Sequence, residues 1–128
     1  MLIWTALVTC LSLLTYSVSC GYVARMRGVH GIKAPATTGH PQFEAAYRVQ
    51  MNTLENLIIY LPALWLFSML IDQRIAAGLG GLWIVGRLIY ARGYLQSPEK
   101  RSTGFLISFS AMMILLLGAL LKSAWLLV

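Results

Sequence analysis

The sequence predicts an all-α fold: an integral membrane four-helix bundle with up-down topology. Of the 128 residues, 59% are hydrophobic and only 11% are charged, whereas a soluble domain carries about 25% charged residues. The hydrophobic residues also form long blocks. The first charged residue, Arg25, follows 24 uncharged residues, and 20 more separate Arg101 from Lys122. Each block matches the roughly 20 apolar residues that a helix needs to cross a bilayer.

The middle of the chain has room for two further membrane helices. There, 16 uncharged residues separate Glu55 from Asp72, and 12 separate Arg74 from Arg87. Because these blocks are shorter, both helices must carry charged residues into the membrane zone. We therefore expect four helices in a single membrane domain, residues 1–128, over approximately residues 2–24, 45–71, 75–96 and 103–127.

The first helix could also be a cleaved signal peptide, which would begin with basic residues. This chain instead begins Met-Leu-Ile-Trp, and its positive charges come after the apolar block. We therefore expect the first helix to remain in the mature protein.

Turn-forming residues separate the expected helices. The segment 28–42 holds glycines, prolines and threonines and is typical of a loop. Residues 72–74 predict a tight turn, and Ser97 followed by Pro98 predicts a helix start with serine as the N-cap. Within the second helix, Pro62 should produce a bend, which bilayer helices tolerate when neighbours satisfy the freed carbonyl.

The basic residues predict how the bundle is oriented. A net charge of +6 in a soluble protein would suggest nucleic acid, but here the basic residues gather in two loops and we expect no nucleic-acid partner. Arg25, Arg27 and Lys33 follow the first helix, and Lys100 and Arg101 follow the third. Positive loops stay in the cytoplasm. We therefore expect loops one and three to be cytoplasmic, in the bacterial inner membrane if the chain is prokaryotic.

The two cysteines limit the available thiol chemistry. Cys10 and Cys20 lie ten residues apart on one expected helix, about 15 Å along its axis, which is too far for a disulfide. No spacing typical of metal ligands is present, so we expect no metal. Any thiol chemistry must therefore use a thiol that a ligand brings.

Polar residues form a stripe at one end of each middle helix. Steps of four, four and three residues place the second helix's stripe within about 80° of arc: Glu44, Arg48, Asn52 and Glu55. The third helix carries a similar stripe within about 60° of arc: Arg87, Tyr90 and Tyr94. Both stripes lie at the cytoplasmic ends of their helices and so occupy one level of the membrane.

Charged side chains at this level must face protein or water. One at the bilayer centre costs roughly 2.5–3.5 kcal/mol, and less near the interface. An ion-pair cluster that only holds the helices together is one interpretation, although buried pairs contribute little net stability. The other is a pocket for a small, multiply anionic ligand, because arginine grips carboxylates with a planar fork.

Two motifs in this order carry a resemblance to a known family: Glu44-x3-Arg48-x3-Asn52-x2-Glu55, then Arg87-x2-Tyr90-x3-Tyr94. Together with the chain length, the four helices and the loop placement, they resemble the MAPEG family, the membrane-associated proteins in eicosanoid and glutathione metabolism. The resemblance covers nearly the whole chain. It implies homotrimers that bind glutathione between helices of neighbouring subunits near the cytoplasmic face.

The resemblance also implies roles for individual residues. Arg101 matches the arginine that activates the thiol in the leukotriene C4 synthase branch. Asn56, directly after the helix-two glutamate, is closer to the microsomal glutathione transferase branch. The positions that match glutathione contacts are Arg48, Asn52, Glu55, Arg87, Tyr90 and Tyr94, with Gln50 and Arg27 at weaker positions.

These observations predict a membrane-bound glutathione transferase, with glutathione peroxidase activity as a second activity of the same site. Its co-substrate would be glutathione, and its second substrate a lipophilic electrophile or lipid hydroperoxide that enters from the membrane lipids. A non-catalytic lipid-binding scaffold with the same trimeric fold is one alternative. A small four-helix multidrug transporter is another, although the arginines beside both helix-two carboxylates suit anions better than cationic drugs.

Overall fold

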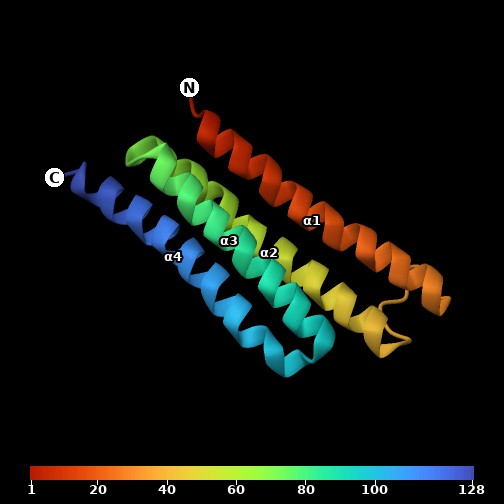
Figure 1. Cartoon of the computed structure of the whole chain (residues 1–128). Helices are drawn as coiled ribbons and strands as arrows, with labels where there is room; N and C mark the ends of the chain where they lie inside the picture. The colour runs from red at the N-terminus through yellow and green to blue at the C-terminus, as the bar shows by residue number, and fades with distance from the viewer.

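The computed structural model describes residues 1–128 as four long helices that run alternately up and down (Figure 1). Both chain termini and the short connection between the second and third helices lie at one end, and the other two connections lie at the opposite end. The helices are α1 (Ile3–His30), α2 (Pro41–Leu70), α3 (Gln73–Gln96) and α4 (Ser102–Trp125), and a short 3-10 helix, η1 (Pro98–Arg101), precedes α4. The expected up-down four-helix bundle is confirmed.

All four helices are long and apolar enough to cross a membrane. The shortest has 24 residues, about 36 Å at the usual rise, against a hydrocarbon core of roughly 30 Å. Large apolar side chains cover the outside of the bundle, for example Leu14, Ile58 and Leu121, which are 60–69% exposed. An apolar outer surface of this kind suits contact with lipid or with another membrane helix.

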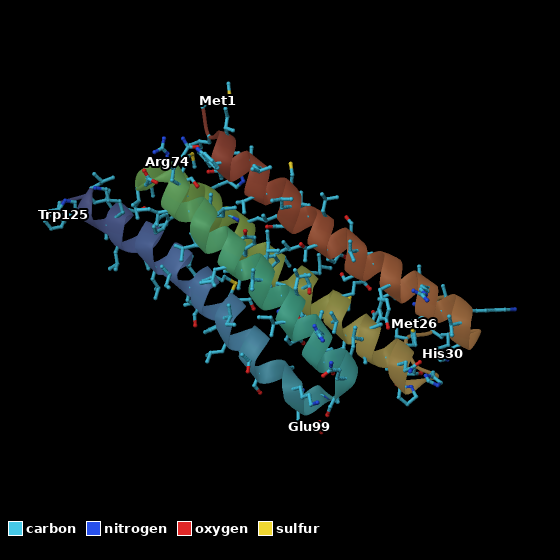
Figure 2. All side chains as sticks on the ribbon, viewed as in Figure 1. Met1, Met26, His30, Arg74, Glu99 and Trp125 are labelled. Carbon is cyan, nitrogen blue, oxygen red and sulfur yellow. The ribbon has the colours of Figure 1, made fainter.

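We name the two ends of the bundle, and the half of the bundle next to each, by the residues found there; Figure 2 labels some of these residues. The polar end holds loop 31–40 beside His30 and the turn that contains Glu99. The terminal end holds Met1, Trp125 and the Leu70–Gln73 connection beside Arg74.

Helices α1 and α2 extend further at the polar end than the sequence predicted. Helix α1 continues six residues past Ala24 and ends where Gly31 adopts φ 64°, with its N–H bonded to the Arg27 carbonyl. Glycine allows this left-handed C-cap at little cost. Helix α2 begins at Pro41, and the His40 side chain accepts a hydrogen bond from the Gln42 N–H. The expected loop 28–42 therefore shrinks to residues 31–40, because the caps lie outside the apolar pattern.

The other two connections are shorter than predicted or are built differently, because α3 begins at Gln73 and Ser97 makes no side-chain cap. Asp72 caps α3 by accepting hydrogen bonds from the N–H groups of Ile75 and Arg74, at 2.9 and 2.7 Å. These two bonds lower the pKa of the Asp72 carboxyl. Ser97 does not act as the predicted N-cap: its side chain makes no capping hydrogen bond, and its hydroxyl donates to the Glu99 carboxylate instead. The helix that follows Ser97 is one 3-10 turn, and α4 begins at Ser102.

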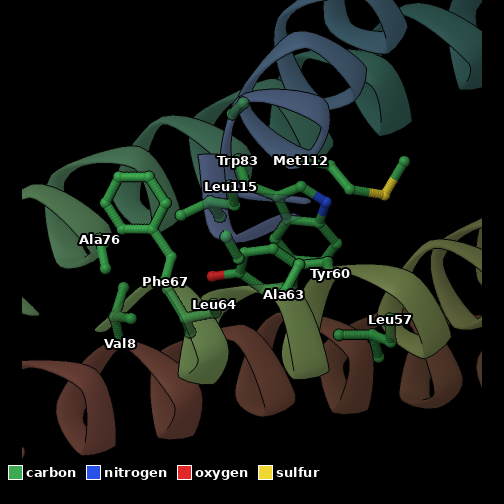
Figure 3. Packing of buried hydrophobic residues seen from close by; sticks show 12 residues of the cluster. Val8, Leu57, Tyr60, Ala63, Leu64, Phe67, Ala76, Trp83, Met112 and Leu115 are labelled. Atoms are coloured by element: carbon green, nitrogen blue, oxygen red, sulfur yellow. The ribbon is translucent and has the colours of Figure 1, made fainter. Parts of the chain in front are cut away.

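The main core lies where α2, α3 and α4 meet α1 in the terminal half (Figure 3). Its centre is a stack of Tyr60 on Trp83, with ring centroids 4.1 Å apart. The Tyr60 hydroxyl also lies 3.0 Å from the Ser12 hydroxyl of α1, and Thr5 donates to Ser68 at 2.7 Å. These hydrogen bonds join α1 to α2 within an apolar layer, where an unpaired polar group would be costly.

Glycines set the closest contact between α3 and α4. A Cβ added at Gly104 would overlap the backbone nitrogen of Tyr90, and one at Gly86 would lie 2.6 Å from the backbone nitrogen of Ser108. Small residues let membrane helices approach this closely. The contact holds α4 against the face of α3 that carries Tyr90, and so positions the wall of the site described next.

Candidate functional site

A cavity of about 600 Å³ opens between α2, α3 and α4 in the polar half. Its volume lies within the usual range for small-molecule sites. Two arginines, an asparagine and a tyrosine provide its polar surface, and the first turns of α4 complete it. The lining residues are Arg48, Asn52, Tyr90, Arg101, Ser102, Phe105 and Leu106.

The cavity carries positive charge on two sides. Arg48 of α2 and Arg101, the last residue of η1, both line it. Glu55 reaches Arg48 with 3.4 Å between Oε1 and Nη1, and each of these side chains is 52% exposed. No acidic residue lines the cavity. The site therefore favours a ligand that carries negative charge.

Asn52 contributes a hydrogen-bond acceptor that has no partner. Its Oδ1 atom is buried and accepts no hydrogen bond within the protein. A buried polar atom without a partner is costly. Because Asn52 lines the cavity, a ligand N–H group could supply the missing donor.

Two tyrosines connect the arginines of α3 and η1. The ring of Tyr90, which is buried and forms part of the wall, lies 5.8 Å from the ring of Tyr94. The Arg101 guanidinium lies 5.9 Å from the Tyr94 ring centroid. Cation–π attraction at this distance helps to hold Arg101 where it lines the cavity.

Arg87 does not line this cavity, although the sequence places it on the same stripe as Tyr90. It is 2% exposed, donates from Nη2 to Thr53 Oγ1 at 2.9 Å, and its guanidinium lies 4.1 Å from the Tyr90 ring centroid. It therefore supports Tyr90 from behind. Thr53 follows Asn52 on α2, and successive residues of a helix point about 100° apart. Asn52 therefore lines the cavity beside Tyr90, whereas Thr53 contacts Arg87 on the other side of the Tyr90 ring.

Gln50 and Arg27 also lie outside the cavity, toward α1. Gln50 donates from Nε2 to Cys20 Sγ at 3.3 Å. Arg27 donates to the Ala36 carbonyl at 2.7 Å and lies 4.7 Å from the Phe43 ring centroid. The expected contacts are thus divided: Arg48, Asn52, Tyr90 and Arg101 line the cavity between α2, α3 and α4. Gln50 and Arg27 lie between α1 and α2, and Arg87 lies behind Tyr90.

The structure adds residues that the sequence did not indicate. Ser102, Phe105 and Leu106 of α4 complete the cavity, and Thr53 holds Arg87. Ser102, Phe105 and Leu106 follow Arg101 by one, four and five residues, a spacing that places them on one helix face. This spacing could have indicated them. Thr53 had no such signal, because it lies outside the stripe of Arg48, Asn52 and Glu55 on the same helix.

Comparison with known proteins agrees with this arrangement. The model of the MAPEG family matches residues 1–121. The chain belongs to the MAPEG family. The family resemblance of the two polar motifs is thereby confirmed, and it applies to nearly the whole membrane domain.

Named relatives of this MAPEG protein include glutathione enzymes. It is 48% identical to an uncharacterized protein of Synechocystis over 97% of this chain and 90% of the relative. It is 37% identical to human microsomal glutathione S-transferase 2 over 90% of this chain and 79% of the relative. It is 34% identical to leukotriene C4 synthase of Cavia porcellus over 87% of this chain and 74% of the relative. The chain is thus similar to both branches that its motifs suggested.

Proposed function

We propose that this MAPEG protein is a membrane-bound glutathione transferase that binds glutathione in the polar-end cavity. One observation carries the proposal: two arginines and an unpartnered buried acceptor, Asn52 Oδ1, share one cavity. Glutathione offers a carboxylate and a thiolate for the two arginines, and peptide N–H groups for Asn52. The names of the microsomal glutathione S-transferase and leukotriene C4 synthase relatives support the same ligand.

In this proposal, Arg48 grips one glutathione carboxylate and Glu55 orients Arg48. The 3.4 Å ion pair holds the arginine at the edge of the cavity, and Glu55 could also meet the ammonium group of the ligand. Tyr90 contacts the ligand from the cavity wall, and Arg87 keeps its ring in place from behind. The family resemblance implies a direct contact for Arg87. The geometry instead supports an indirect role.

Arg101 would stabilise the glutathione thiolate, with Tyr94 beneath its guanidinium. An unperturbed thiol has a pKa near 8.5, and lowering it by about two units requires roughly 2.7 kcal/mol of preferential thiolate binding. The thiol proton leaves to solvent. The thiolate sulfur then forms a bond to an electrophilic carbon, which loses its leaving group or opens its ring. With a lipid hydroperoxide, two glutathione thiols reduce the peroxide to an alcohol and water, and they leave as the disulfide.

The second substrate would enter from the lipid. Phe105 and Leu106 line the cavity and are also exposed on the outer surface of α4, so an apolar electrophile in the bilayer would meet an apolar entrance. This position supports lipophilic electrophiles as the substrate class.

Gln50 and Arg27 would complete the site from a neighbouring subunit. They lie on the α1–α2 face of this chain, away from the cavity residues, so a single chain offers two partial sites. A homotrimer in which the α1–α2 face of one subunit covers the cavity of the next would join them. Chemical cross-linking in membranes tests this arrangement, and a monomer would contradict it.

We further propose that the polar end faces the cytoplasm, in the inner membrane if the source is prokaryotic. The basic residues of loop one and η1 support this orientation. Single cysteines placed at Thr37 and at Gln73 should react with membrane-impermeant reagents from opposite sides. Labelling of both from one side would contradict the orientation.

Glutathione binding is the direct test of the proposed function. At 100 times its dissociation constant, glutathione should stabilise the detergent-solubilised protein by about 2.7 kcal/mol, seen as a rise in melting temperature. A halogenated nitroaromatic should then be conjugated. Arg48→Ala should weaken glutathione binding about 10- to 100-fold, because it removes a charge-assisted hydrogen bond. Arg92→Ala is the matched control, since Arg92 is exposed on α3 outside the cavity. No melting shift and no conjugation would favour the non-catalytic scaffold.

A further inference from the structure

A second hollow, distinct from the glutathione cavity, lies between α1 and α3 with α2 as its floor. We call it the α1–α3 groove. Its volume is about 210 Å³, and most of its lining is apolar, including Val18, Leu88, Ala91 and Leu95. Arg87 is its one charged lining residue, and Thr15, Ser19, Tyr22 and Thr53 contribute hydroxyl groups. None of the residues that line the glutathione cavity lines this groove.

Arg87 is a buried cation whose charge has no counterion. Of its three nitrogens, only Nη2 has a hydrogen-bond partner, Thr53. Nε and Nη1 are buried and have none. The Tyr90 ring covers one face of the guanidinium and compensates its burial in part. An arginine buried in the membrane zone normally pairs with an anion or a carbonyl.

The chain itself does not supply that anion. It contains four acidic residues, and its single ion pair joins Glu55 to Arg48. Asp72 caps α3 at the terminal end, and Glu44 and Glu99 are exposed at the polar end. The missing partner of Arg87 must therefore come from outside the chain.

The shape and lining of the groove define the chemistry of that partner. One cation and a few hydroxyls among mostly apolar side chains suit a single negative charge on an apolar body, and not a dianionic phosphate or a peptide. From Arg87 to Leu95 the groove extends eight residues along α3, about 12 Å at the usual rise. A volume of 210 Å³ is below the roughly 300–1,000 Å³ of drug-sized sites, so the body must be small.

We propose that the α1–α3 groove binds a small apolar monocarboxylate, such as an aromatic acid, with its carboxylate on Arg87 and its body along Ala91 and Leu95. The ligand enters from the interfacial region of the bilayer, where such acids concentrate, at the level of exposed Arg92. It binds without glutathione. Because Arg87 packs against Tyr90, the Arg87–Tyr90 pair forms a wall between the two sites. A ligand in the groove therefore contacts the residue that supports the Tyr90 ring.

Binding of 2-naphthoate to the full chain in lipid nanodiscs tests the proposal, with empty nanodiscs as the blank. Naphthoate fluorescence should show saturable binding, one acid per chain. Arg87→Gln should weaken binding about 10- to 100-fold, as expected for the loss of a charge-assisted contact. The neutral analogue 2-naphthylmethanol should bind more weakly by a similar factor. Arg92→Gln removes an equal charge outside the groove and should leave binding unchanged.

A second variant keeps the test decisive if Arg87→Gln does not fold. Ala91→Trp fills the groove without changing Arg87, and should abolish naphthoate binding while glutathione still raises the melting temperature. Four results would each overturn the proposal: binding equal to empty nanodiscs, acid and alcohol binding alike, full binding by Ala91→Trp, or displacement of naphthoate by glutathione. The last would assign the Arg87 charge to glutathione, and a failure of glutathione to bind would leave the naphthoate result standing.

Discussion

The terminal and polar halves of the bundle treat their buried polar groups differently. In the terminal half, hydroxyls on α1 pair with hydroxyls on α2: Thr5 with Ser68 and Ser12 with Tyr60. In the polar half, Asn52 Oδ1 and two nitrogens of Arg87 have no partner within the chain. Trp83 Nε1 is the exception in the terminal half, although the indole ring is fully buried against Tyr60.

This difference indicates that the terminal half holds the bundle together, and it agrees with the ligand sites proposed for the polar half. In lipid, a polar group without a partner costs several kcal/mol, since no water replaces the partner. A half with satisfied groups and a dense core is stable by itself. A half with unsatisfied groups next to two hollows gains stability when ligands or neighbouring subunits occupy them.

The largest expected effect is on catalysis in the polar half. Arg101→Ala should reduce the conjugation rate about a hundred- to a thousandfold, equivalent to 2.7–4 kcal/mol, if Arg101 stabilises the thiolate. Thiolate absorbance against pH should show a raised pKa for bound glutathione, while the melting temperature stays near that of the unchanged protein. Lys100→Ala is the control, because Lys100 is exposed and does not line the cavity. An unchanged rate and thiol pKa would assign thiolate activation to another group, such as Tyr94 or Arg27.

A core substitution in the terminal half should lower the stability of the bundle and leave glutathione binding unchanged. Leu64 is fully buried, and Leu64→Ala should destabilise the bundle by roughly 2–3 kcal/mol. This is the low end of the usual range, because the side chain leaves one apolar phase for another. Glutathione affinity should stay unchanged. Leu66→Ala, at a position 44% exposed, is the control. A loss of affinity in Leu64→Ala with no loss of stability would contradict the division into halves.

A substitution at the α3–α4 contact should affect both properties. Gly104→Ala places a Cβ against the backbone of Tyr90 and 2.7 Å from the Gly86 carbonyl oxygen, and overpacking of this kind costs about 1–3 kcal/mol. Glutathione affinity should also fall, because Tyr90 and α4 form the cavity wall. At Gly78, inside α3, an added Cβ meets no atom within 4 Å, so Gly78→Ala should leave the affinity unchanged and should not lower the melting temperature, because alanine favours the helix over glycine.

The smallest effect concerns the α3 cap at the terminal end. Hydrogen bonds from the Ile75 and Arg74 N–H groups hold the Asp72 pKa below its usual value, near 3.9. Its stabilising contribution is therefore complete above about pH 4 and is lost as the pH falls through the lowered pKa. Asp72→Asn keeps a capping side chain that does not titrate. The melting temperature of the unchanged protein, relative to this variant, should stay constant from pH 6 to about pH 4 and fall as the pH is lowered further through the lowered pKa. A difference that stays constant below pH 4 would contradict the cap's role.

The sequence by itself determined the membrane class, the number of helices and their alternating directions. These follow from the lengths of the apolar blocks and from the turn residues between them, because a bilayer leaves a chain few other ways to satisfy its backbone. It also identified the polar stripes of α2 and α3, since the 3.6-residue period places Arg48 and Asn52 on one face whatever the surroundings.

Only the tertiary structure decided which of these residues share a cavity. The period fixes the angle of a residue about its own helix axis, but not how that helix is rotated against its neighbours. That rotation depends on contacts such as Gly86 and Gly104 between α3 and α4, which the stripes do not reveal. As a result, Tyr90 and Arg101 join Arg48 in one cavity, whereas Arg87, three residues from Tyr90, faces a different groove beside Thr53.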